Sequence, residues 1–323
     1  MRNNWRIHAV LLSALVGACA IGLSTGAVHL SWQEIFSPGV GRMRLARVLL
    51  SVVVGAGLSV AGVIFQALLR NPLAEPYVLG ASSGAGLAAA LAILLGLSAS
   101  ALGAWALPIT AFAGAMATVV LVYTLARSAR AGGAMSIFSL LLSGVVVGSV
   151  LGSLLMFLVS VAPPERVHNI MWWMLGNLQV FDWALLRAVA ALVCCGLIVT
   201  MLLGRDLNVI AMGEESAAHL GLNPERSKLV LFALGSLITG AVVSAAGLIA
   251  FVGLIVPHSV RLALGPDHRR LVPASAIAGA TFVVLADALG RTVLAPVEIP
   301  VGVVTSVLGG PFFLLLLKRR GRA

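Results

Sequence analysis

Ten apolar stretches, each close to the length that crosses a lipid bilayer, constrain this chain more than any other feature. A hydrocarbon core of about 30 Å requires roughly 20 apolar residues in a helix. The stretches cover residues 7–28, 48–69, 77–97, 107–126, 137–162, 183–203, 229–246, 248–264, 271–289 and 301–317. We therefore expect an all-α polytopic membrane protein with about ten transmembrane helices.

The composition leaves no room for a soluble domain beside these helices. Hydrophobic residues make up 60% of the 323 residues and charged residues only 10%, whereas a soluble domain is about half apolar and a quarter charged. The longest polar connection, about 204–228, is too short to bury a core of its own. We expect one transmembrane domain over 1–323, and its three cysteines, all inside apolar stretches, predict neither a disulfide framework nor a metal site.

The net charge of +10 is explained by membrane orientation. If the amino terminus is cytoplasmic, ten spans place 15 of the 21 Lys and Arg residues on the cytoplasmic side. This asymmetry follows the positive-inside rule and predicts that both termini are cytoplasmic. No basic stripe with interleaved aromatic residues points to DNA or RNA.

An internal repeat suggests two related halves. Residues 55–64 and 240–249 are identical at six of ten positions with an offset of 185, and Pro72 and Pro257 keep the same offset. Related halves are typical of transporters. Because Pro257 removes a backbone hydrogen bond inside an apolar segment, either a simple kink or a hinge at the transport pathway is expected there, and Asn71-Pro72 marks a second candidate break.

The polar loop 208–222 has the pattern of a short amphipathic helix. Ile210, Gly213, Ala217 and Leu220 are arranged for one apolar face, with Gly221 as the end of the helix. A helix lying on anionic lipid would carry a basic polar face. Glu214 and Glu215 lie here instead, which favours a protein partner.

Arginines mark the opposite side of the membrane. Arg44 and Arg47 precede the second span and Arg291 ends the ninth. Asp287 and Arg291 are spaced i, i+4, which predicts an intrahelical pair. Arg44 and Arg47 have no such neighbour, so we expect them to be free to meet an acidic partner.

Several motifs together resemble a known family. They are RLAR at 44–47, NPLAEP at 71–76, LGASSGAG at 79–86, AMGEESAAHLG at 211–221, GLIAFVGLIVPHSVRLALGPDHRRLVP at 247–273 and PVGVVTSVLGGPFF at 300–313. In this order they resemble the FecCD/BtuC-type permeases of type II ATP-binding-cassette importers, which move iron-siderophores, haem and vitamin B12. The resemblance implies a homodimer in the bacterial inner membrane, with a substrate path between the subunits. It also implies a cytoplasmic ATPase dimer and a periplasmic binding protein as partners.

The resemblance also assigns roles to residues. It implies docking of the binding protein at Arg44, Arg47 and Arg291, and narrowing of the pathway near Ser83 and Ser143, beside Asn71, Pro72 and Pro257. It implies that the ATPase is contacted by Ala211, Met212, Gly213, Glu214, Glu215, Ala217, Leu220 and Gly221. No GxxxxGK[ST] motif occurs, so ATP hydrolysis is expected on another chain, which binds ATP-Mg, and no cofactor or metal is expected here. Family frequency favours iron-siderophore or haem as substrate, with cobalamin next.

Two other function classes remain open at this point. Residues 80–84 fit the G-x-S-x-G spelling of a hydrolase nucleophile elbow, with His219 and His258 as conceivable bases, but that motif needs a strand, a turn and a helix, and here it opens an apolar helix. An ion-coupled secondary transporter is suggested by the repeat and by Asp287, because intramembrane carboxylates often relay protons. Arg291 is a ready partner for this carboxylate. A need for an ATPase subunit in transport would separate these classes.

Overall fold

The computed structural model describes residues 4–26, 39–97, 102–128, 136–179 and 182–320. Within these ranges the chain is helical and contains no strand, and each of the ten expected apolar stretches forms a helix. These helices are α1 (Asn4–Ser24), α3 (Val40–Leu68), α4 (Ala81–Leu94), α5 (Ala106–Ser128), α6 (Ile137–Val161), α8 (Trp183–Leu202), α11 (Pro224–Ala246), α12 (Val252–Leu264), α13 (His268–Thr292) and α14 (Val301–Arg320). The expectation of an all-α polytopic fold is confirmed.

The helices differ in length, and two of the three shorter apolar helices follow breaks in the chain. Among the described residues, seven helices are long and apolar enough to cross a bilayer, and three shorter apolar ones cover Ala81–Leu94, Val252–Leu264 and Val301–Leu314. A short 3-10 helix, η1 (Pro76–Leu79), and Gly80 at φ +79° precede α4. Gly247 at φ +70° ends α11, and α12 begins five residues later.

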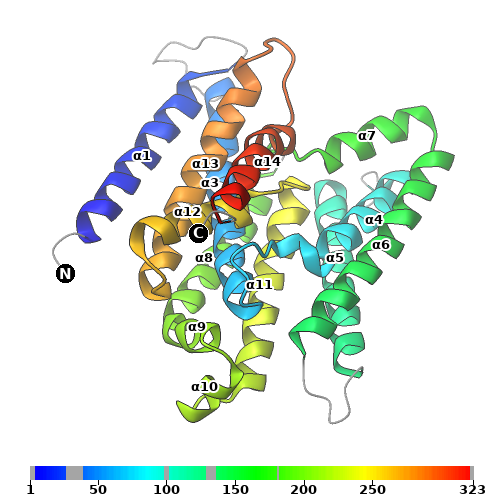
Figure 1. The fold of residues 1–323 in the computed structure, drawn as a ribbon. Coiled ribbons are helices and arrows are strands. Elements are labelled where there is room, and N and C mark those ends of the chain that lie inside the picture. The colour runs from blue at the N-terminus through cyan, green and yellow to red at the C-terminus, as the bar shows by residue number, and fades with distance from the viewer. Residues whose placement is uncertain (1–3, 27–38, 98–101, 129–135, 180–181, 321–323) are drawn as a thin grey trace.

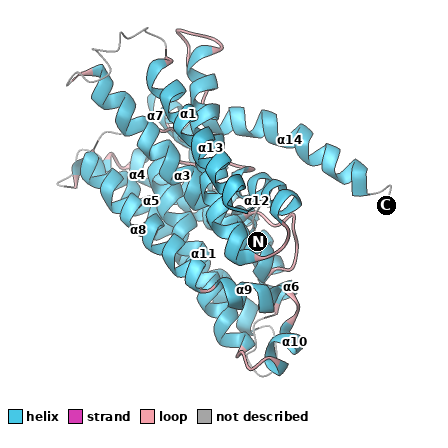
Figure 2. Ribbon diagram, turned by 90° about the vertical axis from the view of Figure 1, so that its left-hand side faces the viewer, coloured by secondary structure: helices cyan, strands magenta, loops and turns pink. Residues whose placement is uncertain are grey.

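The helices form two groups around a central pair (Figure 1). Helices α3 and α11 cross in the middle, with α1, α12 and α13 on one side and α4, α5 and α6 on the other. Helix α7 (Pro164–Met174) lies at one end of the bundle, and the short helices α9 (Gly204–Ala211) and α10 (Glu214–His219) lie at the other. We call these ends the α7 end and the α10 end. Figure 2 shows α14 extending away from the other helices.

Small residues set the closest helix contacts, as expected where lipid provides no hydrophobic drive for association. A Cβ added at Gly55 of α3 would overlap the backbone of Gly279 on α13. One added at Gly62 would overlap the backbone of Gly253 on α12. The backbones of α12 and α13 therefore approach α3 directly, without side chains between them.

The two copies of the repeat lie in helices that run in opposite directions, α3 towards the α10 end and α11 away from it (Figure 1). Residues 55–64 are helical throughout, whereas the copy at 240–249 leaves the helix at Gly247. The helix does not end at Val256-Pro257, where a kink or a hinge is expected, because α12 continues through Pro257. A proline leaves the carbonyl four residues earlier without its helical donor. Here that carbonyl, Gly253 O, accepts a hydrogen bond of 3.3 Å from Gln66 Nε2, which compensates for the loss.

Two helix boundaries also differ from the expectation. Helix α3 begins at Val40, so Arg44 and Arg47 lie inside its first turns and not ahead of it. The single helix expected in the loop 208–222 is two helices, α9 and α10, separated at Met212-Gly213, where Gly213 has a φ of +121°. The second helix does end beside Gly221, which adopts φ +80°.

Candidate functional site

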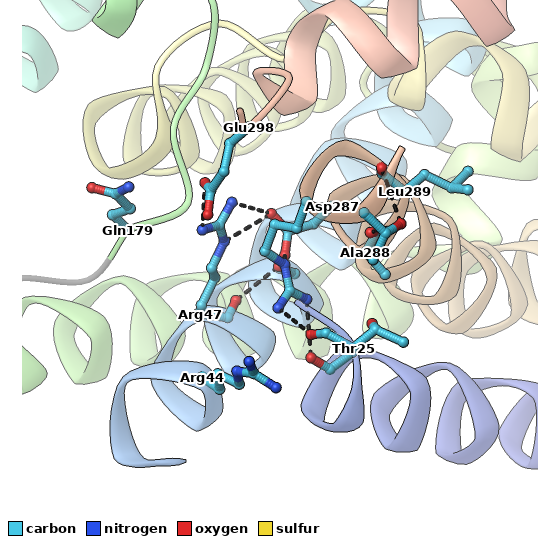
Figure 3. A network of polar contacts seen from close by, with 12 residues as sticks. Thr25, Arg44, Arg47, Gln179, Asp287, Ala288, Leu289 and Glu298 are labelled. Atoms are coloured by element: carbon cyan, nitrogen blue, oxygen red, sulfur yellow. Dashed lines mark hydrogen bonds and ion pairs between the residues drawn. The ribbon is translucent and has the colours of Figure 1, made fainter. Parts of the chain in front are cut away.

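An ion-pair network at the α7 end joins α3, α13 and the connection before α14 (Figure 3). Arg47 lies between two carboxylates: its Nη2 is 2.8 Å from Asp287 Oδ1 and its Nη1 is 2.9 Å from Glu298 Oε2. Arg291 Nε lies 2.9 Å from Asp287 Oδ2, which confirms the predicted intrahelical pair. The Asp287 side chain is only 2% exposed, and the Glu298 side chain is 30% exposed.

Two guanidinium groups, those of Arg44 and Arg291, contact the end of α1. Arg44 Nη1 donates to Leu23 O at 3.1 Å and to Ser24 O at 3.3 Å. Arg291 donates to Thr25 O and Gly22 O, both at 2.9 Å. The last carbonyls of a helix have no partner within it and carry partial negative charge. Arg44 and Arg291 therefore cap α1 and fix it against α3 and α13.

The expectation that Arg44 and Arg47 lack partners is wrong. Their partners come from parts of the chain that the local sequence does not bring near, namely the end of α1, Asp287 and Glu298. Glu298 was missed entirely, although its place in the polar connection before the last span was a usable signal. Asp287, the carboxylate that suggested the secondary-transporter alternative, is paired with two guanidinium groups.

At the α10 end, α9 and α10 present both buried and exposed apolar residues. Leu207, Ile210 and Ala217 are buried against the bundle. Met212 and Leu220 are 67% and 56% exposed, and Glu215 is exposed beside them. An exposed apolar patch with a charged rim is typical of an interaction site.

Glu214 is partly exposed but is paired with α11. Its Oε2 lies 3.0 Å from Nζ of Lys228, whose side chain is 1% exposed at the start of α11, and Glu225 also pairs with this lysine. A buried ammonium requires such partners. Glu214 therefore attaches α10 to α11 while its side chain stays 40% exposed, and contact of both glutamates with a partner stays a prediction.

Asn208 attaches α9 to the turn between α12 and α13. Its Nδ2 donates to Asp267 Oδ1 at 2.8 Å, and its Oδ1 accepts from His268 N at 2.8 Å. Asp267 also accepts from Arg269 N and so caps α13. The hydrogen bond from Asn208 holds the pKa of the Asp267 carboxyl below its usual value.

The break after α3 forms a β-turn. Ala74 N donates to Asn71 O at 3.0 Å, and Leu73 N donates to Asn71 Oδ1 at 3.0 Å. Asparagine at the first position and Pro72 at the second are the residues that such a turn favours. The turn explains how the chain leaves α3 at Asn71-Pro72, as expected.

The two breaks are bonded to each other. Tyr77 Oη donates to Ile249 O and accepts from Ile249 N, both at 3.1 Å. Glu75 Oε1 accepts from Phe251 N at 2.6 Å, and Phe251 has a φ of +68°. Side chains from the first half therefore supply partners for backbone groups that the second break leaves outside a helix.

The remaining pathway candidates lie on adjacent helices. Helix α4 carries Ser83 and packs on α6, which carries Ser143. A Cβ added at Gly148 of α6 would lie 3.5 Å from Ser83 Oγ, so the two helices are close at that level. Asn71 and Pro72 follow α3, and Pro257 is connected to them through Gly253 and Gln66. The described residues place no strand before residues 80–84, so the hydrolase elbow is not formed there.

A cavity of about 590 Å³ lies beneath α7, between the ends of α4, α5, α8 and α11. Trp172 and Trp173 line it together with Arg166 and Asp182. Trp105 Nε1 donates to Asp182 Oδ2 at 2.8 Å, which closes one side.

Two groups of helices around α3 and α11, broken segments that meet between them and short exposed helices at the α10 end are the features of a polytopic transport permease. The chain belongs to the FecCD transport family, whose model matches residues 8–319. It is thus a permease of the type II ATP-binding-cassette importer class and a multi-pass membrane protein.

Named relatives and a solved structure agree with this assignment. The chain is 37% identical to the hemin transport system permease protein HmuU of Yersinia pestis, with 98% of this chain and 96% of the relative covered. It is 42% identical to the cobalamin import system permease protein BtuC of Halobacterium salinarum, over 87% of this chain and 73% of the relative. A structure assigned to a metal-chelate type ABC transporter in an inward-facing conformation superposes with a TM-score of 0.86 at 28% identity, covering 97% of this chain and 98% of the other.

Proposed function

We propose that this chain is the membrane-spanning subunit of an ATP-driven importer that passes a metal chelate from a periplasmic binding protein to the cytoplasm. Iron-siderophore or haem is the first candidate substrate and cobalamin the next. The match to the FecCD transport family over residues 8–319 carries this proposal. The names of the relatives, which include haem and cobalamin permeases, support the substrate class without selecting one member.

The α10 end is the proposed contact with a separate ATPase. Met212, Leu220 and Glu215 offer exposed apolar area with an acidic rim, and the element continues through Ala211, Gly213, Ala217 and Gly221. Buried residues of α9, together with the contacts of Glu214 and Asn208, hold α9 and α10 against the bundle. A moving partner would therefore displace these two helices as a rigid unit. This assignment places the α10 end and both termini in the cytoplasm of a bacterium, with the chain in the inner membrane.

The α7 end is the proposed contact with the binding protein. Arg44 and Arg291 donate hydrogen bonds to carbonyls at the end of α1. We therefore assign them the role of maintaining the shape of the docking surface. Arg47 is the arginine that could meet a carboxylate from outside, because one of its two carboxylate partners, Glu298, is 30% exposed. A carboxylate of the binding protein would replace Glu298 at the same guanidinium edge.

A second copy of the chain is the proposed partner within the membrane. Helix α6 exposes a row of large apolar side chains, including Phe138, Val145 and Phe157 at 73%, 55% and 61%. A homodimer with α6 beside its axis would place Ser143 at the pathway between subunits, near Ser83 and the Asn71-Pro72 turn.

Reconstitution tests the function directly. Purified permease is placed in liposomes with its ATPase and binding protein, and uptake of labelled haem, ferric siderophore and cobalamin is measured. We expect uptake only with ATP and the ATPase, and preference for one substrate. Uptake driven by a proton gradient without the ATPase would support the secondary-transporter alternative and contradict the proposal.

A further inference from the structure

Arg70 occupies a backbone position where glycine is the usual residue. It follows α3 with a φ of +49°, in the left-handed region. Asn71 N donates to Gln66 O at 3.1 Å and Arg70 N donates to Ala67 O at 3.2 Å. This pair of bonds is the Schellman arrangement, in which the residue at the position of Arg70 is most often glycine because a Cβ is disfavoured there. Strained backbone positions persist where the surrounding structure fixes them, and they cluster at functional sites.

The side chain of Arg70 reaches the junction between α9 and α10. A Cβ added at Gly213 would lie 3.3 Å from Arg70 Nη1, so the guanidinium lies directly against this glycine. Gly213 is itself in the left-handed region, at φ +121°, and is buried. The positive group stands beside the carboxyl end of α9, where helix carbonyls favour a cation.

The backbone of Arg70 leads straight into the proposed pathway. The next residues are Asn71 and Pro72 of the β-turn, whose shape depends on the Asn71 hydrogen bonds. Gln66, which accepts from Asn71 N, also donates from its side chain to Gly253 O and Leu254 O at 3.3 and 3.2 Å. The end of α3 is therefore bonded to the segment of α12 that Pro257 leaves without a helical donor.

The α9–α10 element has other attachments as well. Asn208 holds α9 to the turn before α13, and Glu214 holds α10 to Lys228 of α11. These attachments fix the element to the second half of the chain. Arg70 adds a contact from the first half, and it is the contact whose own backbone continues into the Asn71-Pro72 turn.

We propose that Arg70 is a positioning residue that transmits displacement of the α9–α10 element to the Asn71-Pro72 turn and, through Gln66, to α12. Displacement of α10 by the ATPase moves Gly213 against the Arg70 guanidinium. The Arg70 backbone then transmits this movement to the Asn71-Pro72 turn. Coupling carried by such a connected set of contacts is sensitive to a single residue on the route. The inference rests on the proposed ATPase contact and adds the route from that contact to the pathway.

Arg70→Gly separates this role from a structural one. Glycine suits the left-handed conformation, so we expect the thermal stability of the permease–ATPase complex to be unchanged or raised. We expect the ATPase to co-purify as before, while substrate transported per ATP hydrolysed falls by about fivefold. Arg70→Lys keeps the charge without the planar fork and should be intermediate. Arg205→Ala, which removes an exposed arginine from α9, is the matched control and should leave the ratio unchanged.

Each outcome decides between explanations. A wild-type transport ratio in Arg70→Gly would overturn the role of Arg70 and leave the proposed function intact. Loss of the ATPase from the variant would make Arg70 part of the docking surface, and a fall in thermal stability would make it structural; either would overturn the inference. If the wild-type complex shows no ATP-dependent uptake, the proposed function itself fails.

Discussion

Arg47 Nη2 lies 2.8 Å from Asp287 Oδ1, although 240 residues separate the two in the chain. The pair joins α3 of the first half to α13 of the second, and Figure 3 shows Glu298 completing the contact from the other side of the guanidinium. Asp287 also holds Arg291, which caps α1. One buried carboxylate therefore fixes three helices at the α7 end.

Asp287→Asn should destabilise the protein severely. The amide would leave Arg47 and Arg291 without their shared carboxylate, and removing one partner of a buried ion pair costs about 3–5 kcal/mol. Thermal unfolding of the purified permease in detergent measures the effect as a large drop in Tm. Glu215→Gln, which alters an exposed acid at the other end, is the control and should change Tm little. A similar Tm for both variants would show that Asp287 does not hold the helices together.

Gly55→Ala tests the direct contact between α3 and α13. The added methyl group would overlap the backbone of Gly279, and because backbone cannot rotate away, the helices must separate. Overpacking of this kind costs about 1–3 kcal/mol or more. Gly17→Ala in α1 is the matched control, since a Cβ there meets no atom within 4 Å. Equal unfolding temperatures for the two variants would contradict the close approach.

The number and order of the ten apolar helices could be predicted because each depends on one local property, the length of an apolar run. The arrangement between helices could not. Arg44 carries no local sign that the end of α1 lies beside it. Likewise, nothing near Pro257 shows that Gln66, far away in the chain, donates to the carbonyl that this proline leaves open.

The candidate site likewise has features that the local sequence predicts and features that depend on packing between helices. That the loop exposes some apolar residues follows from its local pattern, but which ones does not, because Leu220 is exposed while Ile210 and Ala217, expected on the same face, are buried. The orientation of Glu214 depends on Lys228, whose burial is decided by the packing of α11. Adjacent acids of identical chemistry thus take different roles, and only the three-dimensional contacts distinguish them.

Charge reversal at these two acids should have different consequences. Glu215→Lys changes an exposed residue, so we expect the permease to fold normally and to lose affinity for the ATPase, because unfavourable charge pairs at an interface can cost several kcal/mol. Glu214→Lys places a cation against buried Lys228, so we expect a lower Tm and looser attachment of α10. Co-purification of the ATPase and thermal unfolding, measured on both variants, distinguish the effects. Undiminished ATPase binding by Glu215→Lys would remove this face from the proposed contact.

The last prediction concerns how the α7 end receives the binding protein. If a carboxylate of that protein replaces Glu298 at Arg47, then Glu298→Gln should strengthen binding, because the internal competitor loses its charge while Asp287 still orients the guanidinium. The pair is partly exposed and such pairs contribute up to about 1 kcal/mol, so the expected gain is up to about fivefold in affinity.

Arg47→Lys should weaken binding in the same assay, because lysine keeps the charge but cannot offer two parallel hydrogen bonds to a carboxylate. Affinity is measured at low salt, where electrostatic docking is strongest, and again at high salt, where the difference between variants should shrink. Glu165→Gln, on α7 at the same end, is the control for a general change in surface charge. If Glu298→Gln and Glu165→Gln raise the affinity equally, the gain reflects net charge alone. In that case Glu298 does not compete with the binding protein for Arg47.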